Sequence, residues 1–272
     1  MLFTQDQVNL HTHSFYCRHG TGTIDQYVDS AKAAGLRVLG FSEHCPLPDR
    51  IFPPTSRMDY DQLPLYEADV QKAAKENNIR ILLGAECDWL EDEASFYRDE
   101  LLGARGYDYL ICSIHFMKDP NTGKDRYIGK FGDCFRPYLS AYVYQYTQAL
   151  SSGMFLFGCH PDLFLGGYTS WDNNTKAASV DIISCAIENN IPLEVNDYGL
   201  RKEPIITDTG LRHPYTVREF WELARDMGAK IVTNSDAHRP QDIFPARSFE
   251  FAQSLGIEYC NWKVDGSSIS VC

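Results

Sequence analysis

The chain has 272 residues, of which 44% are hydrophobic and 13% aromatic, and its formal net charge is −12. This length and composition can supply one large buried core, although two small domains would also fit. The acidic balance, with a pI near 5.1, argues against a protein that wraps nucleic acid or lies on an anionic membrane. A small phosphorylated ligand is still compatible with it, because local cations and bound metals set the field inside a pocket.

The N-terminal residues and the cysteines indicate a cytoplasmic protein. The start, Met1–Asp6, lacks the basic and apolar regions of a signal peptide. No apolar stretch approaches the ~18 residues that a membrane span requires. The nine cysteines are scattered singly, and an odd number cannot all pair within the chain. Most of them lie in or beside apolar runs, where a reduced, buried thiol is the simplest interpretation.

Seven short apolar runs are spaced along the chain, and each ends in a residue able to bind a metal or a phosphate. The runs cover 8–10, 38–41, 81–84, 109–114, 155–159, 193–195 and 231–233. Runs this short and this rich in β-formers are typical of buried strands. Polar residues at the C-terminal ends of strands are where an α/β barrel carries its catalytic groups. The pattern therefore predicts a site built from strand ends.

Segments with helical spacing lie between these runs, and Gly or Asn follows each of them, as at a usual helix end. They cover 24–34, 63–76, 94–105, 141–152, 177–188 and 217–227. Strand and helix thus alternate about seven times, which predicts parallel strands with right-handed crossovers. A closed barrel is favoured over an open sheet because ligands from the first and last strands must converge. No linker or repeat marks a boundary, so residues 1–272 are interpreted as one domain.

Three connections are long for an α/β unit. They cover 45–62, which is rich in proline, 118–138 and 197–216. All three follow strand ends, so we expect them to overhang the same barrel mouth and to select the substrate.

Two motifs at opposite ends of the chain predict a metal centre. His11–His13 and Asp236–His238 each place two potential ligands at i and i+2, on one face of an extended backbone. Either motif alone is compatible with a solvated turn. Four more histidines at equivalent ends of elements strengthen the case: His19, His44, His115 and His160. The eighth, His213, precedes Pro214 and is interpreted as a surface or helix-start residue.

Glu86 ends an apolar run, where an unpaired charge would be costly. Its partner is expected to be a metal, the alternative being an arginine from a neighbouring helix. Glu43 has a weaker claim, because it can also point into the barrel wall. Seven imidazoles and two carboxylates without a thiolate suit zinc, manganese or iron, and nine ligands suit three ions. Two metals that share a carboxylate and a water can deliver hydroxide at neutral pH, which is phosphoester-hydrolysing chemistry.

The ligand motifs, in order, resemble those of the polymerase-and-histidinol-phosphatase (PHP) superfamily of metal-dependent phosphoesterases over essentially the whole chain. The resemblance rests on Asn9–Ser14, Phe41–His44, the Glu86 strand end, Ser113–His115, Gly158–His160 and Ser235–His238. It implies a distorted, TIM-like (β/α)7 barrel. It also implies three metal ions per chain. One would bind His11, His13, Glu86 and Asp236; a second Glu86, His115 and His160; and a third His19, His44 and His238.

Within that superfamily the chain is most similar to the histidinol-phosphatase branch. The similarity lies in Pro46–Pro48, Arg57–Met58, Ser113–Phe116, Gly199–Lys202 and Ser235–Pro240. It implies hydrolysis of L-histidinol phosphate to L-histidinol and inorganic phosphate, a step of histidine biosynthesis. The attacking group would be a hydroxide bridging two metals, with Asp236, Glu86 and His238 as catalytic ligands. The leaving alkoxide would take a proton from Asp162 or from a metal-bound water.

The resemblance assigns the substrate phosphate to Arg201, for which the alternative is a surface salt bridge with Glu203. A guanidinium fork suits phosphate oxygens. Relatives commonly carry a basic residue shortly after the Gly-x-His-x-Asp stretch, but residues 161–167 contain none. Arg57, Lys202 or Arg239 is expected to compensate.

Three alternatives remain open at this point. The same chemistry can act on another small substrate, such as a nucleotide, a sugar phosphate or a phosphodiester. A metal-dependent amidohydrolase also uses an HxH motif and a late Asp, but it usually has a bridging lysine and two metals. A non-enzymatic PHP domain would have lost ligands, whereas all nine are present here. The sequence decides neither the metals, nor the general acid, nor the oligomeric state.

Overall fold

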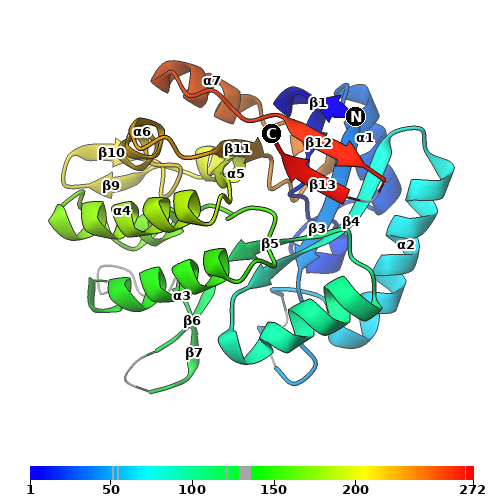
Figure 1. Ribbon diagram of the computed structural model, residues 1–272, viewed down its shortest axis with the longest axis horizontal. Coiled ribbons are helices and arrows are strands. Elements are labelled where there is room, and N and C mark those ends of the chain that lie inside the picture. Colours follow the sequence, from blue (N-terminus) through cyan, green and yellow to red (C-terminus); the bar gives the residue numbers. More distant parts are fainter. Residues whose placement is uncertain (51, 54, 120–121, 129–135, 267) are drawn as a thin grey trace.

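The computed structural model describes residues 1–50, 52–53, 55–119, 122–128, 136–266 and 268–272. Its centre is a ring of short parallel strands with helices outside it (Figure 1). Around the ring come β2 (Val8–Asn9), β3 (Val38–His44), β4 (Arg80–Asp88), β5 (Tyr109–Ser113), Gly158, β8 (Leu193–Asn196) and β11 (Ile231–Asn234). A parallel bridge between Thr12 and Ala237 closes it. The predicted distorted (β/α)7 barrel is confirmed.

The fifth strand of the predicted barrel is only partly formed. Residues 155–159 form no regular strand, and only Gly158 bridges to both β5 and β8. The segment still bonds to β5, because Leu156 N donates to Leu110 O at 2.8 Å. On the other side, Pro192 precedes β8 and has no N–H to donate, so pairing with β8 begins only at Gly158.

Most of the predicted helices are present near their expected bounds. They are α1 (Ile24–Ala33), α2 (Leu63–Glu76), α3 (Leu139–Ser151), α4 (Asn173–Glu188) and α6 (Arg218–Asp226). The helix expected at 94–105 is a π-helix, η5 (Phe96–Ala104), in which Arg105 N donates to Glu100 O at i−5. Within the described residues, two α-helices were not predicted, α5 (Asp197–Arg201) and α7 (Ala246–Leu255). Within the described ranges, no helix is long and apolar enough to cross a membrane.

A small antiparallel sheet brings the two chain ends together at one end of the barrel (Figure 1). It consists of β1 (Leu2–Phe3), β12 (Trp262–Asp265) and β13 (Ser268–Val271). Trp262 and Ile269 belong to the same buried cluster as Val8 and Val232 from the barrel strands. The sheet therefore fills the N-terminal end of the barrel and leaves the other end for the site.

Tyr109 crosses the barrel interior beneath the site. Its hydroxyl donates to Leu10 O at 2.8 Å. A Cβ at Gly40 would lie 2.1 Å from the Tyr109 Oη, and one at Gly84 would lie 2.4 Å from its Cζ. Glycine at these two positions thus makes room for the tyrosine ring inside the barrel.

Two hairpins lie within the predicted long connections. They are β6 (Phe116–Lys118) with β7 (Asp125–Tyr127), and β9 (Ile205–Thr207) with β10 (Gly210–Arg212). Arg50 of the 45–62 connection fastens the first hairpin in place, because it pairs with Asp125 and also with Asp92 and Glu93. Positions 51, 54, 120–121 and 129–135 of these connections lie outside the described residues.

Candidate metal centre and cavity

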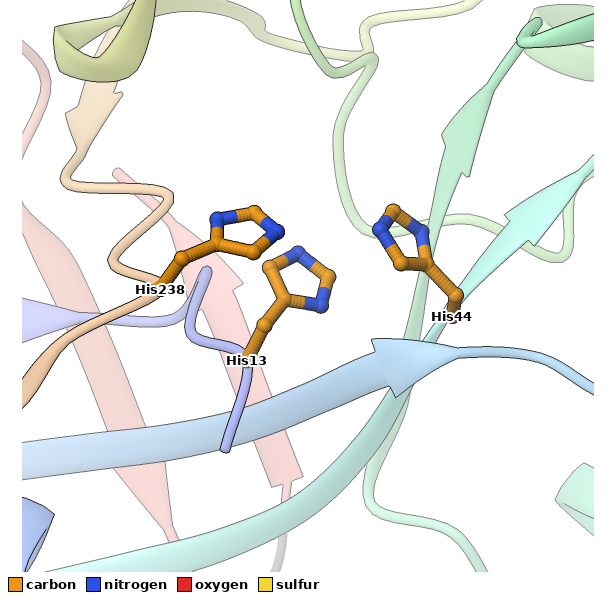
Figure 2. A group of neighbouring side chains, drawn as sticks. All are labelled: His13, His44 and His238. Atoms are coloured by element: carbon orange, nitrogen blue, oxygen red, sulfur yellow. The ribbon is translucent and has the colours of Figure 1, made fainter. Parts of the chain in front are cut away.

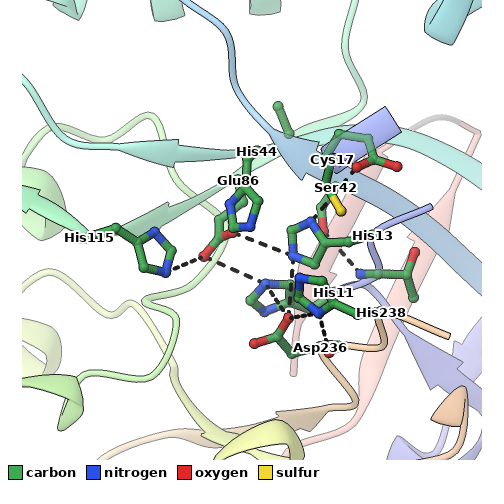
Figure 3. Close-up of polar contacts among 12 residues, drawn as sticks. His11, His13, Cys17, Ser42, His44, Glu86, His115, Asp236 and His238 are labelled. Atoms are coloured by element: carbon green, nitrogen blue, oxygen red, sulfur yellow. Dashed lines mark hydrogen bonds and ion pairs between the residues drawn. The ribbon is translucent and has the colours of Figure 1, made fainter. Parts of the chain in front are cut away.

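The nine side chains predicted to bind metal lie in one cluster at the C-terminal ends of the barrel strands. Figure 3 shows the part of this cluster around Glu86 and Asp236. Glu86 is at its centre. Its oxygens lie 2.6 to 3.8 Å from imidazole nitrogens of His44 (2.6 Å), His160 (3.0 Å), His13 (3.4 Å), His11 (3.6 Å) and His115 (3.8 Å). Burial alone would raise the pKa of Glu86, but the surrounding histidines hold it well below its usual range. The carboxylate is therefore charged and shared among many nitrogens.

Asp236 is the second carboxylate of the cluster. Its Oδ1 lies 3.3 Å from His13 Nε2 and 3.6 Å from His11 Nε2, and it accepts no hydrogen bond. The other oxygen accepts from Asn196 Nδ2 at 3.2 Å. Asp236 and His160 both have positive φ, 47° and 29°. Residues with strained backbone conformations are concentrated at functional sites, where the surrounding structure imposes the conformation.

His19 and His238 supply the clearest sign that the cluster is built for a cation. Their Nε2 atoms lie 3.0 Å apart. Carbonyl oxygens occupy the other nitrogens: Cys17 O and Thr55 O at His19 Nδ1, and Asp236 O at His238 Nδ1. Carbonyls only accept, so both Nδ1 atoms carry a proton, and in the neutral rings both Nε2 atoms present lone pairs to one another. Burial lowers the pKa of His238 to about 3, and a metal ion between the two Nε2 atoms would suit this arrangement.

His13 is stacked between two other imidazoles of the cluster. The His13 ring lies between those of His44 and His238, with centroids 4.2 and 4.5 Å away (Figure 2). Donor atoms of these three residues lie within 4.8 Å of one another, as do those of His44, Glu86 and His115. His44 therefore lies close to Glu86 on one side and to His13 and His238 on the other. Nε2 of His11 and both ring nitrogens of His13 are buried without a hydrogen-bond partner, and such atoms suit metal ligation.

Glu194 is a site residue that the sequence analysis missed. It is fully buried in β8, and its Oε1 lies 2.9 Å from His11 Nδ1. Its oxygens also accept from Asn196 Nδ2 at 2.9 Å, Asn234 Nδ2 at 3.1 Å and His160 N at 3.2 Å. A carboxylate that binds the outer nitrogen of a metal-ligating histidine fixes its tautomer and orientation. The available signal was a glutamate inside a short apolar run, two residues before Asn196.

Asp88 is a second missed residue, and it links His115 to the cavity. Asp88 Oδ1 accepts from the backbone N of His115 and lies 3.4 Å from its Nδ1. Asp88 Oδ2 accepts from Arg57 at 2.8 Å. Arg57 also donates to Cys45 O at 2.7 Å and lies over the Phe52 ring at 3.6 Å. The predicted substrate residue Arg57 thus reaches the cavity but is already paired with a carboxylate.

The two predicted phosphate contacts in α5 and just after it differ in position. Arg201 pairs with Asp197 and donates to Ser235 O at 2.8 Å and Asp236 O at 3.2 Å. It does not line the cavity among the described residues, and the alternative salt bridge with Glu203 is wrong, because Asp197 takes that place. Lys202 does line the cavity, with its Nζ 3.7 Å from the Tyr198 ring centroid.

Two other acids lie outside the cavity wall. Asp162 is fully buried, and its Oδ2 accepts from Val217 N at 2.7 Å while its Oδ1 accepts nothing. Burial raises its pKa to about 6. Glu43 points behind His13, as the weaker interpretation allowed, and accepts from Ser14 N and Ser14 Oγ, both at 2.6 Å. Burial raises the pKa of Glu43 to about 8.

A cavity of about 630 Å³ opens above the cluster. All three long connections contribute to its wall, as expected, through residues that include Arg57, Tyr127, Tyr198 and Lys202, and Phe116 lines it as well. Residues 161–167 contribute Leu163, Phe164, Gly166 and Gly167. The wall is thus largely aromatic and aliphatic, and the described cations that line it are Arg57 and Lys202.

The sequence profile of the PHP domain matches residues 9–198. The chain belongs to the PHP domain family. That match includes seven of the nine clustered ligands, and the structure brings the other two, Asp236 and His238, from beyond it to the same site. The donor set of this PHP domain, with its unpartnered buried nitrogens and carboxylate oxygens, indicates a divalent-metal centre.

Similar proteins carry related names. A probable histidinol-phosphatase of Deinococcus radiodurans is 27% identical over 90% of each chain. A histidinol-phosphatase of Bacillus subtilis is 26% identical over 86% of this chain and 94% of its own. The crystal structure of a histidinol phosphate phosphatase from Lactococcus lactis, complexed with zinc, L-histidinol and phosphate, matches 97% of this PHP chain and 99% of its own, with a TM-score of 0.69 and 17% identity. That likeness shows the shared fold.

Proposed function

We propose that this protein is a metal-dependent phosphomonoesterase that hydrolyses L-histidinol phosphate to L-histidinol and phosphate. The observation that carries the proposal is the nine-residue cluster of imidazoles and carboxylates at the floor of the 630 Å³ cavity. The family and the relatives named as histidinol-phosphatases, which cover about nine-tenths of this chain, support the substrate. The reaction would be a step in histidine biosynthesis.

We infer three ions per chain, of zinc, manganese or iron. His11, His13, Glu86 and Asp236 would hold the first, Glu86, His115 and His160 the second, and His19, His44 and His238 the third. The facing lone pairs of His19 and His238 and the unpartnered Nε2 atoms of His11 and His13 support this assignment. When bound, such ions withdraw charge from phosphoryl oxygens and make water a nucleophile at neutral pH.

The protein's own residues would position the substrate and balance its charge. Lys202 lines the cavity and carries positive charge toward a phosphate dianion, whereas the charge of Arg57, which also lines the cavity, is balanced by Asp88. Arg201 would act indirectly, because its guanidinium holds the Ser235 and Asp236 carbonyls and so fixes the loop that carries Asp236. A role for Asp162 as the proton donor stays a prediction, since its carboxyl lies beside Val217.

A second candidate is the same chemistry on another small phosphorylated compound. It is favoured by residues 161–167, which place leucine, phenylalanine and glycine at the cavity where relatives are expected to offer a basic residue. The metal cluster and the cavity would serve either substrate.

The test is phosphate release by purified protein loaded with manganese or zinc. L-Histidinol phosphate would be compared with a panel of nucleotides, sugar phosphates and p-nitrophenyl phosphate. A preference of about a hundredfold or more in kcat/KM for L-histidinol phosphate, close to 3 kcal/mol of transition-state discrimination, supports the proposal. Equal, low rates across the panel would contradict this substrate and favour the second candidate.

A further inference from the structure

Tyr215 lies at the cavity wall between β10 and α6, beside the metal cluster. Its side chain is 93% buried, with 7% of its surface exposed, and it lines the cavity. The ring meets the His160 ring edge to face, with centroids 6.0 Å apart and an interplanar angle of 71°. Among the described residues the Tyr215 hydroxyl makes no hydrogen bond within the protein, and it lies at the cavity wall. The Tyr215 hydroxyl is thus beside the proposed metal ligand His160 and can donate to a molecule bound in the cavity.

The backbone next to Tyr215 is strained. Thr216 has a φ of 62°, in the left-handed region that β-branched residues rarely adopt. Its Oγ1 donates to Asn196 O at 2.7 Å, which holds the residue in that conformation. Strain of this kind persists only where the surrounding structure imposes it, and it is concentrated at functional sites. Here it fixes the direction in which Tyr215 leaves the main chain.

Gly199 in α5 makes room for the same ring. A Cβ at this position would lie 2.6 Å from Tyr215 Cδ2 and 2.6 Å from Thr216 Oγ1. The backbone of Gly199 has no positive φ, so its conformation alone does not require glycine. The absent side chain is explained by the tyrosine ring that occupies its place. The strained backbone of Thr216 and the absent side chain of Gly199 therefore both determine the position of the Tyr215 ring.

The neighbouring tyrosines of the cavity are engaged differently. Tyr198 has Lys202 Nζ 3.7 Å from its ring centroid and stacks on His238 at 4.9 Å. Tyr127 lies at the rim and is 43% exposed. Tyr215 alone among these three combines deep burial with contact to a proposed metal ligand.

The cavity needs donors for phosphate oxygens on the side where residues 161–167 offer no cation. A phenol donates one hydrogen bond, and it carries its proton at neutral pH. We propose that the Tyr215 hydroxyl donates a hydrogen bond to a non-bridging oxygen of the substrate phosphate. The inference rests on the proposed phosphomonoesterase function, and it identifies Tyr215 as a catalytic residue of that reaction.

The test compares Tyr215→Phe with wild type in the metal-loaded enzyme, using inorganic phosphate as the probe. The variant keeps the ring and loses only the donor. We expect its affinity for phosphate to fall about tenfold or more by calorimetry, as for a hydrogen bond to a charged group. We expect kcat/KM to fall about 10- to 100-fold, equally for L-histidinol phosphate and p-nitrophenyl phosphate. Bound metal and Tm should not change, and Tyr144→Phe on the exposed face of α3, away from the cavity, is the matched control and should behave as wild type.

Three outcomes would overturn the proposal. Unchanged phosphate affinity in Tyr215→Phe would remove the contact. A loss confined to L-histidinol phosphate, with p-nitrophenyl phosphate spared, would place the phenol at the leaving oxygen instead. A parallel loss of bound metal would make Tyr215 a support for His160. Binding of inorganic phosphate does not depend on the organic part of the substrate, so failure of L-histidinol phosphate as substrate would be seen separately.

Discussion

The Glu194 carboxylate lies 2.9 Å from Nδ1 of His11, and both side chains are fully buried. This contact directs the opposite nitrogen, Nε2, toward Glu86 and Asp236, both 3.6 Å away. Asn234 donates to Glu194 as well, so the carboxylate itself cannot rotate freely. The orientation of the first histidine of the chain is therefore set by a strand near residue 194.

Glu194 should matter for metal affinity even though it is not a proposed ligand. Glu194→Ala removes the partner of His11 Nδ1, and we expect affinity for zinc to fall about 10- to 100-fold. Glu194→Gln can still accept from that nitrogen, so its loss should be smaller. Competition titrations with a chromogenic chelator measure both, and Glu222→Gln on the exposed side of α6 is the surface control. Unaltered affinity in Glu194→Ala would show that other contacts orient His11.

The clustered ligands should be needed for turnover, whereas the remaining histidine should not. His11→Ala removes a proposed metal ligand close to Glu86, and Asp236→Ala removes one close to His13. We expect both variants to lose activity and bound metal. His213 is the matched control, because its Nδ1 contacts Lys202 O away from the cluster. Phosphate release and elemental analysis of the same samples provide the readout. Full activity in either ligand variant would contradict the site.

The ligands were predictable because their signals are local. The spacing of His11 and His13 and the position of Glu86 at a strand end can be read from a few residues, and barrel topology then brings such ends together. Glu194 and Asp88 were missed because their roles depend on partners far along the chain, His11 in one case and Arg57 in the other. Likewise, the strand expected at 155–159 depends on pairing with the segment at Pro192, which no local pattern reveals.

The phosphate contacts also depend on partners far along the chain, and the structure gives Arg201 and Lys202 different roles. Arg201 holds the carbonyls of Ser235 and Asp236, so we expect Arg201→Ala to lower bound metal as well as kcat/KM. Lys202 lines the cavity, so Lys202→Ala should raise KM and weaken phosphate binding while bound metal stays constant. Elemental analysis alongside kinetics distinguishes the two. If Arg201→Ala kept its full metal content and lost only phosphate affinity, the guanidinium would be a direct phosphate contact.

Glu43 should make the stability of the metal-free protein depend on pH. Burial raises its pKa from an ordinary value of 4.5 to about 8, so the folded state keeps a proton that the unfolded chain has lost between these values. Unfolding then releases a proton, and the free energy of unfolding falls as pH rises, by at most about 1.4 kcal/mol per pH unit. Glu43→Gln keeps an acceptor for Ser14 and cannot titrate, so its stability should decline less between pH 5 and pH 7.5. Urea unfolding of chelator-treated wild type and variant measures the difference, and parallel slopes would mean that Glu43 is ionised in the folded protein.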